Sequence, residues 1–384
     1  METDAAMKIV LIGPVPPYRG GIAHFTASLA SAFENQGHNV LTISYKTQYP
    51  KLLYPGKNEK DFSQAPFDAQ FLFSSYNIPD WRKTLTAIKS FETDLVIYPW
   101  WVSVWAPATA WLLRRLRKAA IPVKVLVHNT LPHEENLFDK ILTRWALGNV
   151  THFVTMTDRE SDRLRKVVGD QKTIQTAPHP VYQQFPSTGL SKSELRQQLN
   201  LPVDLPLALF FGFVRPYKGL GILIDALAIL KQKKVNLHVV VSGEFWESRT
   251  NYENQIKDLE VEDMITLHDR YIPDSEAGLY FEAADLFVAP YLDGTQSGSI
   301  KQAMGYNLRL VVSDVITDPL ILANPAGCRR APAGDAAALA IGIEKALSNN
   351  QTTAHQINFQ ESWQDLLDVL TDPSPKAGGF EKEH

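Results

Sequence analysis

The sequence has little cysteine and no excess of positive charge. Its 384 residues include one cysteine, Cys328, which excludes an internal disulfide and any metal or iron–sulfur site built from several cysteines. Lys and Arg number 38 against 42 Asp and Glu, so the formal net charge is −4. A general nucleic-acid binder needs a basic surplus on at least one face, so this class is not favoured. The single cysteine fits a reducing compartment.

Several nucleotide-binding and catalytic motifs are also missing. The loop after the first apolar run, Gly13–Gly21, has no GxGxxG, which argues against a nicotinamide or flavin dehydrogenase. The chain contains no GxxxxGK[ST] phosphate loop, no GxSxG nucleophile elbow and no DxD triplet that could hold a metal–diphosphate complex. A bound diphosphate would therefore be held by side-chain cations and backbone amides, and we expect no metal and no cofactor.

One uncharged segment, Leu95–Leu113, is long enough to be considered as a membrane span. Pro99 and Pro107 interrupt it, and its opening DLVIYPW predicts a buried strand followed by a loop and then a helix. It contains four of the eight tryptophans, namely Trp100, Trp101, Trp105 and Trp111.

The eleven residues after this segment, Arg114–Lys124, carry five cations and no acid. Tryptophans beside a basic helix suit the headgroup layer of an anionic bilayer. Three interpretations stay open: a spanning helix, a peripheral membrane contact through Trp100–Lys124, and a core helix with a solvated basic face. The N-terminus places acids before a short apolar run, the reverse of a signal peptide. We therefore expect a cytoplasmic protein, peripheral at most on the cytoplasmic face of the membrane.

Short apolar runs alternate with amphipathic stretches as far as about residue 350. This alternation predicts an α/β fold of parallel sheets with helices on both faces, and the length fits two such domains. The predicted strands are Lys8–Ile12, Val40–Ser44, Leu95–Tyr98, Val123–Val127, Phe153–Met156, Thr173–Thr176, Leu207–Phe211, Leu237–Val241, Ile265–Leu267, Leu286–Ala289 and Leu310–Val312.

Polar and apolar patterning also predicts the boundaries of the domains. We expect an N-terminal domain over 1–183, a polar linker over 184–204 and a C-terminal domain over 205–355. A last amphipathic helix over 356–370 precedes a tail over 371–384 that is rich in Pro, Gly and charge and is expected to be disordered.

The two halves begin with similar turns. GPVPPYRG over Gly13–Gly20 and GFVRPYKG over Gly212–Gly219 are identical at five of eight positions, and each follows the first strand of its half. A chance match is the alternative to a duplicated architecture. In a duplicated architecture, each half offers helix N-terminal amides and a cation at the carboxyl end of a strand, where such sheets bind anions.

The second of these turns has the chemistry of a diphosphate site. Arg215 and Lys218 add two charges to a loop whose glycines allow close approach of the backbone. The loop after the strand at Leu286–Ala289 leads into a helix that starts near Ser297, and the amides and hydroxyls of Ser297, Gly298 and Ser299 suit a phosphate. The alternatives are a plain surface turn for the first loop and a self-capping helix for the second.

His128 directly follows the strand Val123–Val127 and is the candidate for chemistry in the first half. A histidine at the carboxyl end of a parallel strand can contact a substrate or transfer a proton, although a structural role is the alternative. His133 lies in the next loop, at a spacing that is not the HExxH of a zinc protease.

Together these motifs resemble the GT-B-fold family 4 retaining glycosyltransferases. The resemblance rests on GPVPPYRGGI, VHN, FGFVRPYKGL and the TQSG loop with its following helix, and it covers residues 8 to about 370. It implies two Rossmann-like doubly wound domains facing across a cleft. The nucleotide-sugar donor would bind mainly to the C-terminal domain and the acceptor to the N-terminal one, and the last helix, with Trp363, would return to the first domain.

The resemblance also implies a role for each matching residue. Arg215 and Lys218 would bind the donor diphosphate, the Ser297–Ser299 amides the distal phosphate, and the backbone at Ile272 the nucleobase. The residues expected near the reacting phosphate or the donor sugar are Gly20, Gly21 and His128.

The sequence departs from the family pattern at two acidic positions. The family commonly has two glutamates eight positions apart in the second loop and its helix. Here Gln302 stands at the later one, where it can still bond a ribose, and the earlier one has no counterpart, with Asp293 the nearest acid.

We therefore expect a metal-independent hexosyltransferase that moves a sugar from a nucleotide diphosphate sugar to an acceptor hydroxyl, with retention, in cell-surface glycan or glycolipid synthesis. No carboxylate pair of the glycosidase kind is evident, which fits a route without a covalent intermediate. A sugar-nucleotide epimerase, a phosphorylase, a silent nucleotide-sugar-binding protein and, least favoured, a dehydrogenase remain as alternatives.

Overall fold

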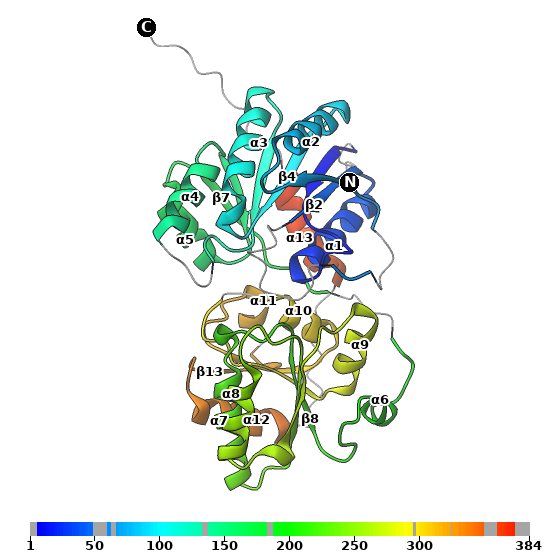
Figure 1. Ribbon diagram of the computed structural model, residues 1–384, viewed down its shortest axis with the longest axis vertical. Helices are drawn as coiled ribbons and strands as arrows, with labels where there is room; N and C mark the ends of the chain where they lie inside the picture. Colours follow the sequence, from blue (N-terminus) through cyan, green and yellow to red (C-terminus); the bar gives the residue numbers. More distant parts are fainter. Residues whose placement is uncertain are drawn as a thin grey trace. The chain divides into compact units, whose positions relative to one another are not determined.

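A computed structural model describes most of the chain, and its contacts divide the chain into two units (Figure 1). The described residues are 6–48, 60–62, 67–132, 137–182, 187–294, 297–323, 325–348 and 359–372. Unit 1 comprises Met1–Leu53, Pro66–Ala177 and Trp363–His384, and unit 2 comprises Tyr54–Ala65 and Pro178–Ser362.

Unit 1 is built on a seven-stranded sheet in which all paired strands are parallel, in the order β3-β2-β1-β4-β5-β6-β7. Its strands are β1 (Lys8–Ile12), β2 (Asn39–Thr47), β3 (Gln70–Ser74), β4 (Leu95–Trp100), β5 (Val123–Val127), β6 (His152–Thr155) and β7 (Thr173–Thr176). Its helices are α1 (Gly21–Asn35), α2 (Ile78–Ser90), η2 (Ser103–Trp105), α3 (Ala106–Lys118), α4 (Leu137–Leu147), α5 (Asp158–Val168) and α13 (Phe359–Thr371).

Unit 2 is built on a six-stranded sheet, also parallel throughout, in the order β10-β9-β8-β11-β12-β13. Its strands are β8 (Leu207–Phe211), β9 (His238–Ser242), β10 (Ile265–His268), β11 (Leu286–Ala289), β12 (Arg309–Ser313) and β13 (Cys328–Ala331). Its helices are α6 (Lys192–Gln198), η3 (Pro216–Lys218), α7 (Leu220–Gln232), α8 (Arg249–Asp258), η4 (Glu262–Met264), α9 (Asp274–Ala283), α10 (Gly298–Gly305), α11 (Pro319–Leu322) and α12 (Ala336–Ser348). The predicted architecture of two doubly wound parallel sheets is confirmed.

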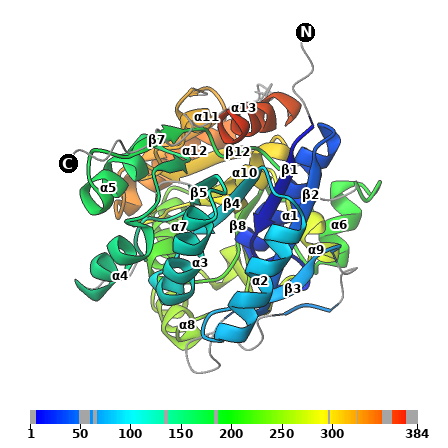
Figure 2. The same cartoon turned by 90° about the horizontal axis from the view of Figure 1, so that it is seen from above.

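The strand order of each sheet reverses next to its first strand. In unit 1 the chain builds outward from β1 through β2 and β3 and then returns to add β4 on the other side of β1 (Figure 2). In unit 2 it builds from β8 through β9 and β10 and returns to add β11 beside β8. Ligands of open α/β sheets bind at such a switch point, beyond the carboxyl ends of the strands. The loops after β1 and β4, and after β8 and β11, are therefore the positions to examine.

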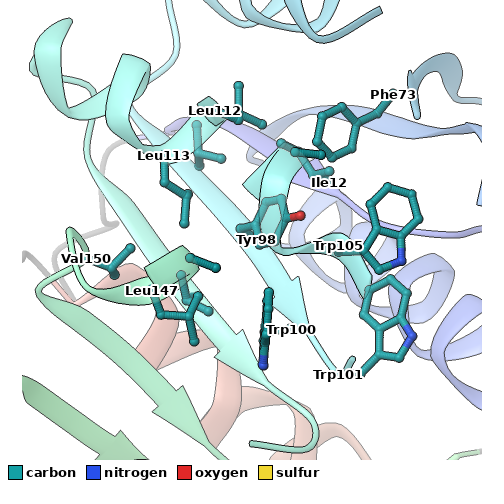
Figure 3. Close-up of a cluster of buried hydrophobic side chains, with 14 of the residues drawn as sticks. Ile12, Phe73, Tyr98, Trp100, Trp101, Trp105, Leu112, Leu113, Leu147 and Val150 are labelled. Atoms are coloured by element: carbon teal, nitrogen blue, oxygen red, sulfur yellow. The ribbon is translucent and has the colours of Figure 1, made fainter. Parts of the chain in front are cut away.

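The segment Leu95–Leu113 is part of the core of unit 1. All six residues of β4 are buried, and α3 follows the short helix η2, as the prolines predict. The Trp105 ring lies 4.3 Å from the Tyr45 ring, and Figure 3 shows Trp101 and Trp105 near Phe73. Burial inside unit 1 therefore accounts for the long apolar sequence of this segment. Among the helices that the structure describes, none is long and apolar enough to cross a bilayer.

This packing takes three tryptophans out of the predicted membrane contact through Trp100–Lys124, and a contact through the exposed part of the segment stays a prediction. Trp100, Trp101 and Trp105 are buried and cannot enter a headgroup layer. Lys124 is buried as well. Its Nζ donates hydrogen bonds to the carbonyl oxygens of Val369 and Asp372 at 2.7 and 2.8 Å. What the segment leaves exposed is the basic end of α3, formed by Arg114, Arg115, Arg117 and Lys118.

Contacts near the two predicted domain boundaries show which unit each neighbouring helix joins. Part of the expected linker, 184–204, forms α6, which begins at a Ser191–Glu194 capping box and packs on α9 of unit 2. At the other end, α13 belongs to unit 1 from Trp363 onward, and Trp363 contacts Phe25 with ring centroids 5.8 Å apart. The predicted disordered tail lies outside the described residues beyond Asp372.

Candidate functional site

The loop after β8 has a backbone that only glycine accommodates at two places. Gly212 has a φ of +103°, and a Cβ atom there would lie 2.8 Å from the Lys218 Nζ. Gly219, which precedes α7, has a φ of +70°, and a Cβ atom there would collide with the carbonyl oxygen of Pro290. The loop after β8 is therefore pressed against the loop after β11 at the switch point of the sheet.

Lys218 is held between these two loops. Its side chain is folded back over Gly212, is only 8% exposed, and its Nζ lies 3.4 Å from the carbonyl oxygen of Phe211. The same Nζ is 5.7 Å from the centre of the Tyr291 ring, which belongs to the loop after β11. The Lys218 ammonium group therefore lies at the carboxyl edge of the sheet, where an anionic group can complete its hydrogen bonds.

Three hydroxyl groups gather beside Lys218 at the start of α10. The Tyr291 hydroxyl lies 3.1 Å from Ser297 Oγ and 3.4 Å from Ser299 Oγ, and the two serine oxygens are 3.0 Å apart. Ser297 is the residue before α10, yet its side chain makes no capping hydrogen bond to the helix. The first-turn amides and the hydroxyls thus form a set of donors suited to a phosphate. Thr295 and Gln296 of the TQSG motif lie outside the described residues.

Arg215 lies against aromatic rings at the same edge. Its Cζ is 5.5 Å from the ring centres of both Tyr217 and Trp246. Burial raises the pKa of Tyr217, an effect that the charges of Lys218 and Arg215 oppose and that of Asp293 reinforces. These three charged side chains therefore surround Tyr217, and the structure brings both predicted cations to one place.

An aromatic surface extends from this point along the carboxyl edge toward β10. Phe213 packs on Trp246 with ring centroids 4.5 Å apart and planes inclined by 30°, and on Tyr271 at 6.5 Å and 29°. All three rings are half-buried, so part of each remains accessible. Near-parallel aromatic rings of this kind can stack against a planar base.

Three further predicted residues lie in or near this edge. Ile272 follows Tyr271, but its side chain is buried in the hydrophobic core of unit 2, so only its backbone could meet a ligand. Gln302 is buried on α10 one turn after Gly298, and Asp293 is half-buried in the loop after β11.

In unit 1 the loop after β1 shares some features with the loop after β8. Val15 and Val214 are both completely buried, and Gly20 and Gly219 both precede a helix with positive φ. The backbones differ, because Gly20 has φ and ψ of 105° and 165° and Gly219 has 70° and 31°, and the loop after β8 forms a 3-10 helix over Pro216–Lys218 that the loop after β1 lacks. The similar sequences therefore do not form the same turn. A Cβ atom at Gly21 would meet nothing within 4 Å, so the start of α1 is open.

His128 lies at the same edge of the unit 1 sheet. Its backbone N–H donates to Trp100 O at 2.8 Å, and its buried ring meets the Phe25 ring edge-on at 4.8 Å. Phe25 is on the first turns of α1, so the structure brings His128 close to the helix that begins at Gly21. Glu160 supports this edge by accepting a hydrogen bond from the Thr130 amide at 2.9 Å. His133 lies outside the described residues.

Comparison with known families gives a consistent result for both halves. The family "Glycosyltransferase Family 4" matches residues 19–184, and the family "Glycosyl transferases group 1" matches residues 191–363. The chain belongs to the family 4 glycosyltransferases.

Individual relatives of this family 4 glycosyltransferase are distant. It is 25% identical to a GDP-mannose:glycolipid 4-beta-D-mannosyltransferase of Xanthomonas campestris pv. campestris over 197 residues. This alignment covers 51% of each chain. Over 153 residues it is 30% identical to the amylovoran biosynthesis glycosyltransferase AmsK of Erwinia amylovora, which covers 38% of this chain and 36% of that one. The aligned region thus spans about half the length of the first relative and less of the second.

Solved structures resemble nearly the whole chain. The sucrose-phosphate synthase tll1590 of Thermosynechococcus elongatus has a TM-score of 0.68 at 18% identity, with 95% of this chain and 97% of that chain covered. Anabaena Alr3699/HepE in complex with UDP-glucose has a TM-score of 0.67 at 16% identity, with 94% of each chain covered. At such identities the likeness shows the fold alone, and the predicted GT-B fold class is confirmed.

Sequence reasoning missed the aromatic residues of the candidate site, which are Phe213, Tyr217, Trp246, Tyr271 and Tyr291. The segment SGEFW at the end of β9 contained one signal that an aromatic residue would join the site. A Cβ atom at Gly243 would collide with the Gly212 carbonyl oxygen, so this glycine marks the place where the loops after β8 and β9 touch. Trp246 follows three residues later and is brought onto Phe213 by that contact.

Over the residues that the structure describes, no group of three or more His, Cys, Asp or Glu side chains is placed to hold a metal ion. Metal-independent transfer stays a prediction from the sequence.

Proposed function

We propose that this family 4 glycosyltransferase transfers a sugar from a nucleotide diphosphate sugar to an acceptor hydroxyl, with retention of the anomeric configuration. The observation that carries the proposal is the position of Lys218, buried beside the Tyr291, Ser297 and Ser299 hydroxyls at the uncapped start of α10. The crystallised relative Alr3699/HepE, whose fold is similar, was solved with UDP-glucose. That complex supports a nucleotide sugar as the class of donor.

In the proposed reaction the bond between the sugar and the diphosphate breaks, and negative charge develops on the leaving diphosphate. Lys218 and Arg215 supply positive charge, and the amides of Ser297 and Gly298 supply hydrogen-bond donors. Because these groups are fixed by the two contacting loops before the substrate arrives, they stabilise the developing charge without reorganising. Removal of one such donor typically lowers the rate on the order of 10² to 10³.

The nucleoside end of the donor is assigned to the aromatic surface. The base would stack near Phe213, Trp246 and Tyr271, with the backbone at Ile272 available to its edge. Gln302 would bond the ribose, because its amide offers both a donor and an acceptor. The base itself is left open, so UDP, GDP and ADP sugars are all candidates for measurement.

Unit 1 is assigned the acceptor and the sugar end of the donor. Gly20 and Gly21 would allow close approach to the reacting phosphate, and His128 would hydrogen-bond the sugar. The relatives are named for a glycolipid acceptor and for amylovoran biosynthesis. They support a lipid-linked saccharide as acceptor, in cell-surface glycan synthesis at the cytoplasmic face of the membrane.

A catalytically silent nucleotide-sugar-binding protein is the second candidate. The observation in its favour is the departure from the family pattern, with Gln302 at one glutamate position and no acid at the other. The two candidates differ in turnover rather than in binding.

One experiment separates the candidates. The protein is incubated with UDP-glucose, GDP-mannose or an ADP sugar, with and without a lipid-linked saccharide acceptor, and release of the nucleoside diphosphate is followed. We expect release that requires acceptor, together with an NMR spectrum of the product showing the anomeric configuration of the donor. Stabilisation by a donor without release indicates the silent protein, and conversion of the donor without acceptor indicates an epimerase.

A further inference from the structure

Helix α4 of unit 1 presents a row of large apolar side chains to solvent. Phe138, Ile141 and Trp145 are 72%, 65% and 42% exposed. They lie three and four positions apart, which places them on one face of the helix. The opposite face carries Asp139, Thr143, Ala146 and Leu147, which are all buried. We call the exposed row the α4 surface.

Cations surround the α4 surface. Helix α3 packs beside α4 (Figure 1), and the Arg114 guanidinium lies 5.5 Å from the centre of the Trp145 ring. The last two turns of α3 also expose Arg117 and Lys118, and α3 contains no acid, whereas Arg115 lies away from α4 on the Trp111 ring, which packs on Trp81 of α2. On α4 itself, Lys140 and Arg144 are exposed next to the apolar row.

The positive charge continues past the ends of both helices. Lys172 donates to Gly148 O at 2.8 Å, just after α4, and its pKa is lowered by burial and by the charge of Arg117. Arg117 in turn donates to Asn149 Oδ1 at 3.2 Å. Basic side chains therefore border the apolar row along its length, an arrangement that suits a surface with apolar and anionic layers.

This surface is also rigidly joined to unit 1. Asp139 in the first turn of α4 accepts a hydrogen bond from Ser103, which lies just after β4, and both residues are buried. Leu147, on the buried face of α4, lies in the same core as Trp100 (Figure 3). The apolar row is therefore held at a fixed position relative to the carboxyl edge of the sheet that carries His128.

We propose that the α4 surface binds an anionic lipid bilayer, with Phe138, Ile141 and Trp145 entering the headgroup layer and the arginines and lysines of α3 and α4 meeting lipid phosphates. Charge complementarity selects this occupant. A second copy of the chain placed symmetrically on the same surface would bring two clusters of arginine and lysine together, which is unfavourable. Lipid phosphates are complementary to that charge, and about four exposed cations near a bilayer suffice for measurable attraction.

The test is flotation of the purified full-length chain with vesicles of phosphatidylcholine alone or of phosphatidylcholine with phosphatidylglycerol. The measurement contains neither donor nor acceptor, so its result is independent of the proposed transfer reaction. We expect binding to the anionic vesicles to exceed binding to the neutral ones by about tenfold or more and to weaken with salt. Equal binding to the two kinds of vesicle, or none to either, overturns the proposal.

Two variants and one control assign the binding to this surface. The triple substitution Phe138→Ser, Ile141→Ser, Trp145→Ser and the double substitution Arg114→Glu, Lys118→Glu are each expected to reduce binding at least about tenfold. Ile341→Ser, at an apolar residue on α12 of unit 2 that is about as exposed as Trp145, should leave it unchanged. Each of these side chains is exposed, so thermal unfolding should confirm an intact fold.

Light scattering of the same proteins tests whether a second copy of the chain, and not a bilayer, binds the α4 surface. If the wild-type chain is a dimer that the triple variant converts to a monomer while vesicles are not bound, the α4 surface is a self-association site and the proposal is wrong. Retained binding in the triple variant contradicts the proposal equally.

Discussion

Gly219 lies directly against the carbonyl oxygen of Pro290, so that no side chain fits between them. This contact joins the loop that carries Lys218 to the loop that leads into α10. The Leu292 amide strengthens it by donating to the Tyr217 carbonyl oxygen at 2.6 Å. The donor groups of the candidate site are thus held together by backbone contacts.

Gly219→Ala should separate the two loops. The change adds a methyl group that collides with Pro290 and forces a non-glycine residue to keep a φ of +70°. Gly189→Ala is a matched control, because Gly189 has a φ of +71° but no atom within 4 Å of an added Cβ. The backbone strain alone costs about 1–2 kcal/mol. We expect Gly219→Ala to lower the melting temperature clearly more than Gly189→Ala and to abolish donor-induced stabilisation; equal effects would contradict the account.

Tyr291→Phe should weaken donor binding without disturbing the core. The substitution keeps the ring near Lys218 but removes the hydroxyl that contacts Ser297 and Ser299. A lost hydrogen bond of this kind is worth about 1 kcal/mol, so the donor KM should rise roughly fivefold. Initial-rate kinetics measures this, with Tyr306→Phe in the core of unit 2 as control. An unchanged KM would remove the hydroxyl cluster from the site.

Trp246→Ala should weaken binding of the nucleoside part of the donor. Base stacking on an aromatic ring contributes about 1–3 kcal/mol, which corresponds to roughly five- to 150-fold in affinity. Calorimetry with a nucleoside diphosphate should show this loss, while affinity for inorganic pyrophosphate should change little. If both ligands lose affinity equally, Trp246 supports the diphosphate site and not the base.

His179 should make the stability of unit 2 depend on pH. Burial, together with the nearby charge of Lys301, lowers the pKa of this histidine to about 3. Its Nδ1 lies 2.8 Å from Pro180 O, to which the neutral ring donates. The unfolded chain binds the proton near pH 6.5, so the folded state loses stability as the pH falls below about 6.5.

Denaturant unfolding of the wild type and of His179→Asn between pH 4.5 and 7.5 measures this dependence. For the wild type we expect a contribution approaching about 1.4 kcal/mol per pH unit below pH 6. The variant should show a flatter profile, whatever its absolute stability. Parallel profiles for the two proteins would mean that His179 is protonated in the folded state.

Features encoded in one continuous stretch of the sequence could be predicted more often than features that depend on distant segments meeting in the fold. Five predicted strands match the observed bounds, and two of them, β1 and β8, contain the apolar runs typical of buried parallel strands. The sequence reading missed β3 and β13. Both lie at sheet edges, and β13 contains Arg329 and Arg330.

The residues of the candidate site fall into two groups, those that lie in contiguous sequence motifs and those that the fold brings together. Lys218, Ser297 and Ser299 were predictable because each lies in a contiguous motif at a strand–helix turn. Phe213, Trp246 and Tyr271 come from the loops after β8, β9 and β10, and they meet because these strands are neighbours in the sheet. A single sequence shows the strands but not their order.

The tryptophan-rich segment shows a second limit. Hydrophobicity and neighbouring charge fit both a membrane-facing helix and a core, and the burial of Trp105 against Tyr45 decides for the core. The exposed apolar row lies instead on α4, where the residues between Phe138, Ile141 and Trp145 are polar except for the half-buried Leu142.

The most direct test of the central claim is turnover of Lys218→Ala. With a nucleotide sugar and a lipid-linked acceptor, we expect acceptor-dependent release of the nucleoside diphosphate to fall on the order of 10² to 10³. The melting temperature should stay close to that of the wild type, and the exposed Lys257→Ala on α8 should retain full activity. A Lys218→Ala variant that folds and transfers sugar at the wild-type rate would contradict the assignment of the diphosphate to this site.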